Sequence, residues 1–152
     1  MNLEIRRHLL ELLEGKFAHI DIETALLDFP LEHMNTRIEN SPHTAWELVE
    51  HIRLAQADIL EFSVGPEYRE KIFPDDYWPK EVGSEVTWNA SAKQILADLQ
   101  AMRDLVSDEE NDLFAPFPWG DGQTLLREAM LAADHNSYHL GQLMLLRRIL
   151  EK

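Results

Sequence analysis

Apolar residues recur at helical spacing over most of this chain, in four separate segments. The first covers residues 3–28, the second begins at 41–44 and ends before Gly65, the third covers 88–107, and the fourth 124–150. In each segment apolar side chains return every three or four positions, which places them on one face of an α-helix. The pattern therefore predicts an all-α protein.

Capping residues mark the starts of the later helices. Thr44 is followed three positions later by Glu47, the pattern of a capping box, and Ser41 before Pro42 offers an alternative start. Thr87 stands where the third helix needs its N-terminal cap. These residues predict where each helix begins.

The first segment contains one weak point. Gly15 lies inside it, and a glycine within a helix costs about 1 kcal/mol relative to alanine. Pro30 lies just past the end of the segment, where a helix has already stopped. Since the cost at Gly15 is modest for a long helix, we expect one continuous helix over residues 3–28.

Two connections rich in proline and aromatic residues separate the later helices. Residues 64–86 include Phe73–Pro79, whose prolines prevent a helix, and the second connection includes Phe114–Trp119. A connection of about 20 residues is longer than neighbouring antiparallel helices require, so it predicts a crossover between the second and third helices. Four helices and one long crossover predict a four-helix bundle, in a single domain over residues 1–152.

Composition excludes several classes of function. The net charge is −14, with 14 Lys and Arg against 28 Asp and Glu, so the chain lacks the basic face that nucleic acids and anionic membranes require. It has no cysteine, which excludes disulfides, thiolate ligands and a cysteine nucleophile. Residues 1–8 show no signal-peptide pattern, and no stretch reaches the ~20 apolar residues of a membrane helix. We therefore expect a cytoplasmic protein.

The candidate chemistry lies in three of the seven histidines. His135 and His139 are four residues apart in a helical segment, so their rings project from the same face. His51 lies in the second helix. If the two helices pack face to face, the three imidazoles converge, and three nitrogens with an open fourth position make a catalytic divalent metal site. The remaining histidines are expected to be solvated, with His19 able to line a pocket: His8, His19, His33 and His43.

Two familiar kinds of histidine-containing metal site do not fit this sequence. Residues 135–139 read His-Asn-Ser-Tyr-His, which differs from the His-Glu-x-x-His motif of zinc proteases. A carboxylate-bridged di-iron centre requires a glutamate three positions before a histidine, and no glutamate in the chain has that spacing. A structural role for each histidine, as a hydrogen-bonded core residue, stays open.

Two segments resemble the DinB-like (YfiT-like) family of metal-dependent enzymes. Ser41–Ile52 contains Thr-x-Trp-Glu-Leu-x-x-His, which is similar to the start of the family's second helix. His135–Leu143 is similar to the family's pattern in the fourth helix, His-x-x-(aromatic or His)-His-x-Gly-Gln. The length of the chain, the order of the helices and the spacing between the segments extend the resemblance over nearly the whole chain.

The resemblance implies a homodimeric four-helix bundle whose metal ligands are His51, His135 and His139. Some members of the family are transferases or isomerases that use a low-molecular-weight thiol. The implied cofactors are therefore a divalent ion (zinc, nickel or iron) and, for such a reaction, a thiol. Hydrolysis or thiol-dependent transfer on a small-molecule substrate both stay open. The alternative is a non-catalytic dimeric bundle, an interaction or stress-related module with a structural or vestigial metal site.

Residues near the histidines are expected to complete the site. Glu47 and Asp134 are candidates to orient the rings, as neighbours of metal ligands commonly do. Gly141 is expected to allow close helix approach, Gln142 to make a buried polar contact, and Tyr138 to pack. The two loops rich in proline and aromatic residues either wall an apolar substrate pocket, cap the ends of the bundle or form a dimer contact.

Overall fold

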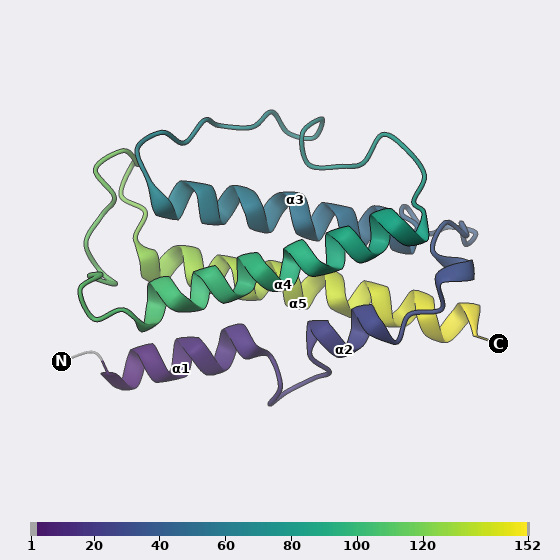
Figure 1. Cartoon of the computed structure of the whole chain (residues 1–152), viewed down its shortest axis with the longest axis horizontal. Coiled ribbons are helices and arrows are strands. Elements are labelled where there is room, and N and C mark those ends of the chain that lie inside the picture. The colour runs from purple at the N-terminus through teal and green to yellow at the C-terminus, as the bar shows by residue number, and fades with distance from the viewer. Residues whose placement is uncertain (1–2, 152) are drawn as a thin grey trace.

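The computed structural model describes residues 3–151, and its regular elements are helices (Figure 1). They are α1 (Leu3–Glu14), α2 (Ile22–Leu27), the short 3₁₀ helix η1 (Leu31–His33), α3 (Ala45–Val64), α4 (Glu85–Ser107) and α5 (Leu125–Leu150). The predicted all-α class is confirmed, since this range contains no strand beyond an isolated bridge between Pro116 and Thr124. No helix in it combines the length and apolar character needed to cross a membrane.

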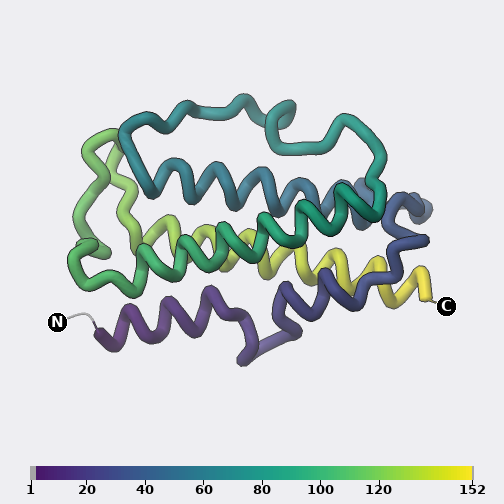
Figure 2. The backbone as a smooth tube through the Cα atoms, in the orientation of Figure 1, coloured from purple at the N-terminus to yellow at the C-terminus, as the bar shows by residue number. Residues whose placement is uncertain are grey.

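The prediction of one helix over residues 3–28 is wrong, because the chain leaves the helix at Gly15. Gly15 has a φ of 68°, the left-handed conformation that often ends a helix and that glycine adopts without strain. Asp21 then caps α2, its carboxylate accepting the backbone N–H of Thr24 at 2.9 Å. In Figure 2 the tube turns aside between α1 and α2. This glycine therefore separates two helices.

Hydroxyl groups cap the three long helices. Thr44 and Glu47 form the predicted capping box, with N–H···O distances of 3.2 and 2.8 Å. Thr124 caps α5 by accepting the N–H of its third residue. The predicted cap of α4 is wrong: Ser84 takes that place, and Thr87 is the third helical residue of its capping box. The helix begins earlier than predicted because Ser84 satisfies its free N–H groups.

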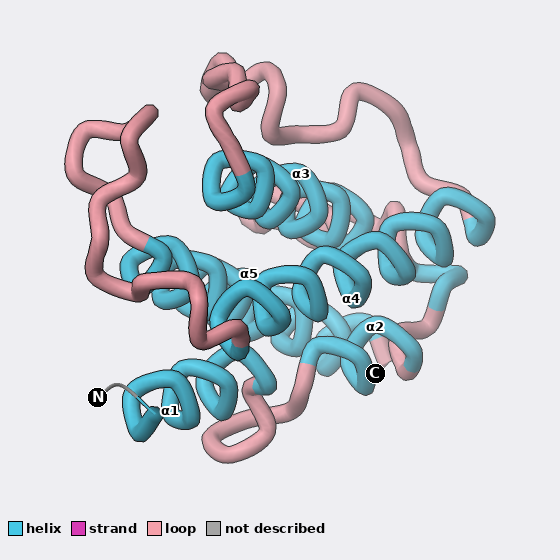
Figure 3. Tube along the Cα trace, turned by 60° about the vertical axis from the view of Figure 1, so that its left-hand side comes forward, coloured by secondary structure: helices cyan, strands magenta, loops and turns pink. Residues whose placement is uncertain are grey.

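The helices form three levels in Figure 1. Helices α4 and α5 lie between α3 and the α1–α2 pair, and Figure 3 shows the same order from another side. Accordingly α3 packs mainly on α4 and α5, and α1 and α2 contact the same two helices. The long connection, residues 65–84, runs back along the length of α3, so α3 and α4 point in the same direction (Figure 1).

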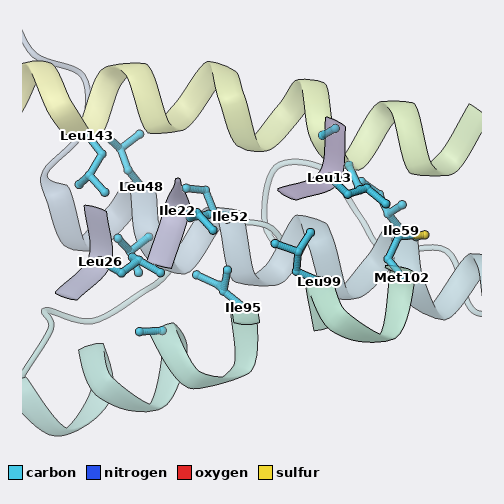
Figure 4. Close-up of a cluster of buried hydrophobic side chains, with 14 of the residues drawn as sticks. Leu13, Ile22, Leu26, Leu48, Ile52, Ile59, Ile95, Leu99, Met102 and Leu143 are labelled. Atoms are coloured by element: carbon cyan, nitrogen blue, oxygen red, sulfur yellow. The ribbon is translucent and has the colours of Figure 1, made fainter. Parts of the chain in front are cut away.

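The core contains aliphatic side chains from every α-helix (Figure 4). Leu13, Leu26, Ile52, Ile95 and Leu143 come from α1 to α5 in that order, and each is buried. Burial of this face fixes how each helix is rotated about its axis. On α3 and α5 it directs the neighbouring positions toward the boundary between the two helices, where the histidines lie.

Asp58 holds the long connection on α3. Its two carboxylate oxygens accept the hydroxyls of Tyr68 at 3.0 Å and Tyr77 at 2.6 Å. Burial, with the carboxylate beside it, raises the pKa of Tyr68 to about 12 and the pKa of Tyr77 further. Both hydroxyls therefore remain protonated donors at neutral pH. The backbone of Tyr77 is thereby fixed against α3, next to His51.

Candidate metal centre

Three histidine rings converge between α3 and α5. The ligand nitrogens of His51, His135 and His139 lie within 4.8 Å of one another. The Nε2 atoms of His51 and His135 are 3.1 Å apart, and the ring centroids are separated by 4.9, 4.6 and 4.5 Å. The structure thus brings together the three histidines that the sequence singled out.

Helix geometry and burial together produce this convergence. His135 and His139 are one turn apart on α5, which puts both rings on one face. The buried residues Ile52 and Leu140 follow His51 and His139 directly and face the core. With these neighbours fixed inside, the histidines lie where α3 and α5 meet.

Hydrogen bonds fix the tautomers of two rings. The Nδ1 of His51 donates to the carbonyl of Tyr77 at 2.7 Å, and the Nδ1 of His139 donates to Oε1 of Gln142 at 2.7 Å. Since a carbonyl oxygen only accepts, Nδ1 carries the hydrogen in both rings. The lone pair of each ring is therefore on Nε2, and in His51 this atom faces the Nε2 of His135.

The third ring has a different environment. The Nδ1 of His135 is buried and has no hydrogen-bond partner among the described residues. Its Nε2 faces the Nε2 of His51 at 3.1 Å. Because the His51 nitrogen carries a lone pair, either a hydrogen of His135 or a cation has to lie between the two atoms. A metal ion bound here would replace the hydrogen bond between these two rings.

The electrostatics of the cluster favour neutral rings. Burial lowers the pKa of His51 and of His139. Burial also lowers the pKa of His135 to about 4, and the two neighbouring imidazoles add to this effect. At neutral pH all three rings are uncharged. Neutral imidazole is the form that ligates a metal, so protons compete weakly at this site.

The arrangement fits a divalent transition metal. Bonds of 2.0–2.1 Å from a tetrahedral zinc to three histidines place the nitrogens about 3.3 Å apart. The 3.1 Å between the Nε2 atoms of His51 and His135 is close to that value, and the ligand nitrogens of all three rings lie within 4.8 Å of one another. Imidazole suits zinc, nickel, copper and iron, so the donors allow several ions.

Trp78 covers one side of the cluster. Its indole stacks on His51, with centroids 3.9 Å apart and planes 5° apart, and it also stacks on His43 at 3.9 Å. The loop Phe73–Pro79 therefore forms a wall of the centre. The expectation that His43 is solvated is wrong, because this ring is half-buried against Trp78 and burial lowers its pKa.

The residues that orient the rings differ from those expected. Glu47 is engaged in the capping box and in an ion pair with Arg37 at 2.6 Å, and Asp134 is exposed. The carbonyl of Tyr77 and the amide of Gln142 bond to the rings in their place. The sequence indicates a polar contact for Gln142 but not its histidine partner. A backbone carbonyl such as that of Tyr77 leaves no mark in the sequence.

Other neighbours lie at the margin of the centre or away from it. A side chain added at Gly141 would meet nothing within 4 Å, so this glycine faces open space and the expected helix contact is wrong. Tyr138 is 65% exposed, and the packing expected of it is limited to an edge-on contact with His139, with ring centroids 4.9 Å apart. Trp119 donates to the carbonyl of Phe62 at 2.8 Å near the end of α3. The second loop therefore covers that helix end.

The comparisons with known proteins found no match for this chain. No protein-family model matches this chain, no curated protein is similar to it, and no solved structure matches it. The geometry of the three histidines and of the residues that contact them is therefore what supports a function.

Proposed function

We propose that this protein is a metal-dependent enzyme in which His51, His135 and His139 bind one divalent ion. The proposal is carried by one observation: the three rings converge while the Nδ1 atoms of His51 and His139 are already occupied. Three protein ligands leave a coordination position for water or substrate, which distinguishes catalytic from structural zinc sites. Zinc, nickel or iron is the expected ion.

The chemistry follows from an open position beside neutral ligands. A divalent ion lowers the pKa of a bound water toward about 7 and acidifies a bound thiol in the same way. Because the chain has no cysteine, a thiol nucleophile has to arrive as a small cosubstrate. The reaction is therefore hydrolysis or transfer to a low-molecular-weight thiol, on a small-molecule substrate. Tyr77 and Gln142 hold the ring orientations, and Trp78 shields His51 from water.

A DinB-like four-helix bundle is part of the same proposal. In it α1 and α2 are two halves of one interrupted helix, and residues 65–84 are the crossover. The parallel course of α3 and α4 supports this assignment (Figure 1). Two residues of the Thr-x-Trp-Glu-Leu-x-x-His motif also support it. Thr44 caps the start of α3, and the Nε1 of Trp46 donates to the carbonyl of Glu81 at 2.9 Å, near the end of the crossover. A homodimer is the expected assembly.

Elemental analysis of untagged protein tests the metal site. We expect about one ion per chain in the wild type and a loss of the ion in His139→Ala, since two imidazoles hold a divalent ion far less tightly than three. His19→Ala is the matched control, because this exposed histidine contacts Ser137 of α5 but lies outside the cluster. A wild type that takes up no zinc, nickel or iron at saturating concentration would overturn the proposal.

The orienting role of Gln142 gives a separate prediction. Gln142→Met removes the acceptor of the His139 Nδ1–H while keeping a side chain of similar size. Loss of such a contact typically lowers metal affinity about 10–100-fold. Gln142→Glu keeps an acceptor and is expected to stay near or above wild-type affinity. Competition with a zinc-binding dye measures both, and equal affinities for wild type and Gln142→Met would contradict the role.

The second candidate is a non-catalytic dimeric bundle that binds a protein partner. Apolar side chains exposed along α5 favour it, among them Tyr138 at 65% and Leu145 at 57% exposure. In that case the ion is structural or vestigial. Exchange of a metal-bound water with solvent, measured by relaxation of the cobalt-substituted protein, separates the two functions: rapid exchange supports the enzyme, and no exchange supports the interaction module.

A further inference from the structure

We infer that a cavity beside the three histidines binds the apolar part of the substrate, which is therefore a small molecule with a hydrocarbon or aromatic body and a polar head. The cavity has a volume of about 280 Å³ and lies between the segment before α3 and the last turns of α5. This inference rests on the proposed metal centre for the position of the head, and on the cavity itself for the body.

The wall of the cavity is mainly aliphatic. The apolar part of the wall is formed by Ile38, Pro42, Leu48, Leu145, Leu146 and Ile149. Leu48 and Leu146 are buried, whereas Leu145 is 57% and Ile149 44% exposed. The cavity is thus open to solvent on one side with apolar surface in contact with water. An apolar ligand would remove that surface from water, which is the main source of affinity in such sites.

Two helices connect the cavity to the histidines at short range. Leu48 lies three residues before His51 on α3, and Gln142 lies three residues after His139 on α5. Residues three apart share a helix face and are separated by about 4.5 Å along the axis. Gln142 also hydrogen-bonds to His139, so the same side chain lines the cavity and touches the centre.

Two polar residues of the cavity are linked to the histidines, and three others, Glu39, Asn40 and Ser41, line it from the segment before α3. His43 lines the cavity and stacks on Trp78, which in turn stacks on His51. Gln142 faces it from α5, whereas Ile149 at the far end is apolar. The links of His43 and Gln142 to the histidines set the orientation of the ligand. Its polar head passes between His43 and Gln142 toward the metal ligands, and its body points toward Ile149.

The size of the cavity favours a small molecule over a protein surface. Small-molecule sites typically have volumes of roughly 300–1,000 Å³, and 280 Å³ is close to that range. A stable protein interface buries about 800 Å² on each partner, which requires a much wider apolar surface. The cavity therefore fits a small molecule better than it fits a second copy of the chain.

A series of alkyl hydroxamates, from acetohydroxamate to octanohydroxamate, tests the inference on zinc-loaded protein. The head binds the ion and the chain extends into the cavity, so calorimetry should show Kd falling about two- to fourfold per added methylene until the cavity is full. Leu145→Trp should remove this dependence and keep the zinc. Leu12→Trp is the control, since Leu12 is another partly exposed helical leucine, at 48%. A wild-type Kd independent of chain length would overturn the inference, as would unchanged dependence in Leu145→Trp.

A metal-free measurement separates this inference from the metal site. Adding 1-hexanol to the metal-free protein should shift the amide resonances of Leu145, Leu146 and Ile149, and Leu145→Trp should abolish the shifts. This result stands even if the histidines bind no ion. No shift at these residues in the wild type would overturn the cavity assignment. So would a dimer that dissociates in Leu145→Trp, because a second copy would then fill the cavity.

Discussion

Zinc is expected to raise the free energy of unfolding of the metal-free protein by about 4 kcal/mol when the free ion exceeds its Kd a thousandfold. The folded chain holds the ligand nitrogens of His51, His135 and His139 within 4.8 Å of one another. In the unfolded chain His51 and His135 are 84 residues apart, so a three-histidine site forms rarely. Urea denaturation at buffered zinc concentrations measures the difference.

Two variants decide whether the increase belongs to this cluster. His139→Ala should lose most of the zinc-dependent stabilisation, whereas His19→Ala should keep it. Equal stabilisation of both variants would place the ion elsewhere. A stabilisation that is absent already in the wild type would contradict metal binding by the folded protein.

The pH dependence of the same experiment follows from the lowered pKa values. The unfolded chain protonates its histidines near pH 6.5, while the folded chain keeps these rings neutral to lower pH because burial lowers their pKa, that of His135 to about 4. The unfolded state therefore binds more protons between these values, and metal-free stability falls as pH decreases from 6.5 toward 4. The slope is up to about 1.4 kcal/mol per pH unit for each histidine. His135→Gln should reduce it, and an unchanged slope would contradict this.

The stabilisation by zinc should also depend on pH through the lowered pKa values of the three histidines. At pH 6.5 the folded rings are still mostly neutral, so the zinc-dependent increase is expected to persist there. At pH 4 about half of the His135 rings are protonated in the metal-free protein, which by itself weakens zinc binding about twofold, so the increase should only begin to fall there. An increase that already falls clearly between pH 7.5 and pH 6.5 would show that the rings titrate as solvated histidines do.

Local chemistry explains which parts of the fold were predictable. Thr44 and Glu47 are three residues apart and satisfy each other's neighbouring N–H groups, so the start of α3 could be predicted from adjacent residues. Gly15 could not be placed in the same way. A glycine inside a helix and a glycine that ends one look alike in sequence, and only the conformation, a φ of 68°, distinguishes them.

In the site too, contacts set by local helical spacing were predictable, whereas contacts set by the path of the long connection were not. His135 and His139 could be paired because helical spacing alone puts them on one face. Trp78 and the carbonyl of Tyr77 reach His51 only because the long connection folds back along α3 and Asp58 holds it there. No local pattern encodes that path. The burial of His43 could not be predicted for the same reason, since its partner Trp78 comes from this connection.

Trp88→Ala is expected to lower the free energy of unfolding by about 3–5 kcal/mol, the usual cost of removing a large buried aromatic side chain. Trp88 is 1% exposed on α4, and its ring packs at 5.1 Å from Phe29. Its Nε1–H donates to the carbonyl of Leu26 on α2 at 3.2 Å. Because α2 is short, these contacts with α4 hold it in place. Urea denaturation of wild type and variant gives the difference.

Trp88→Phe separates the cost of lost ring packing from the cost of the lost hydrogen bond. The phenyl ring keeps most of the contact with Phe29 but leaves the carbonyl of Leu26 without its donor, so a cost of about 1–2 kcal/mol is expected. If Trp88→Phe costs as much as Trp88→Ala, the hydrogen bond rather than ring packing holds α2. If Trp88→Ala costs less than about 1 kcal/mol, α2 is attached mainly through its contacts with α5.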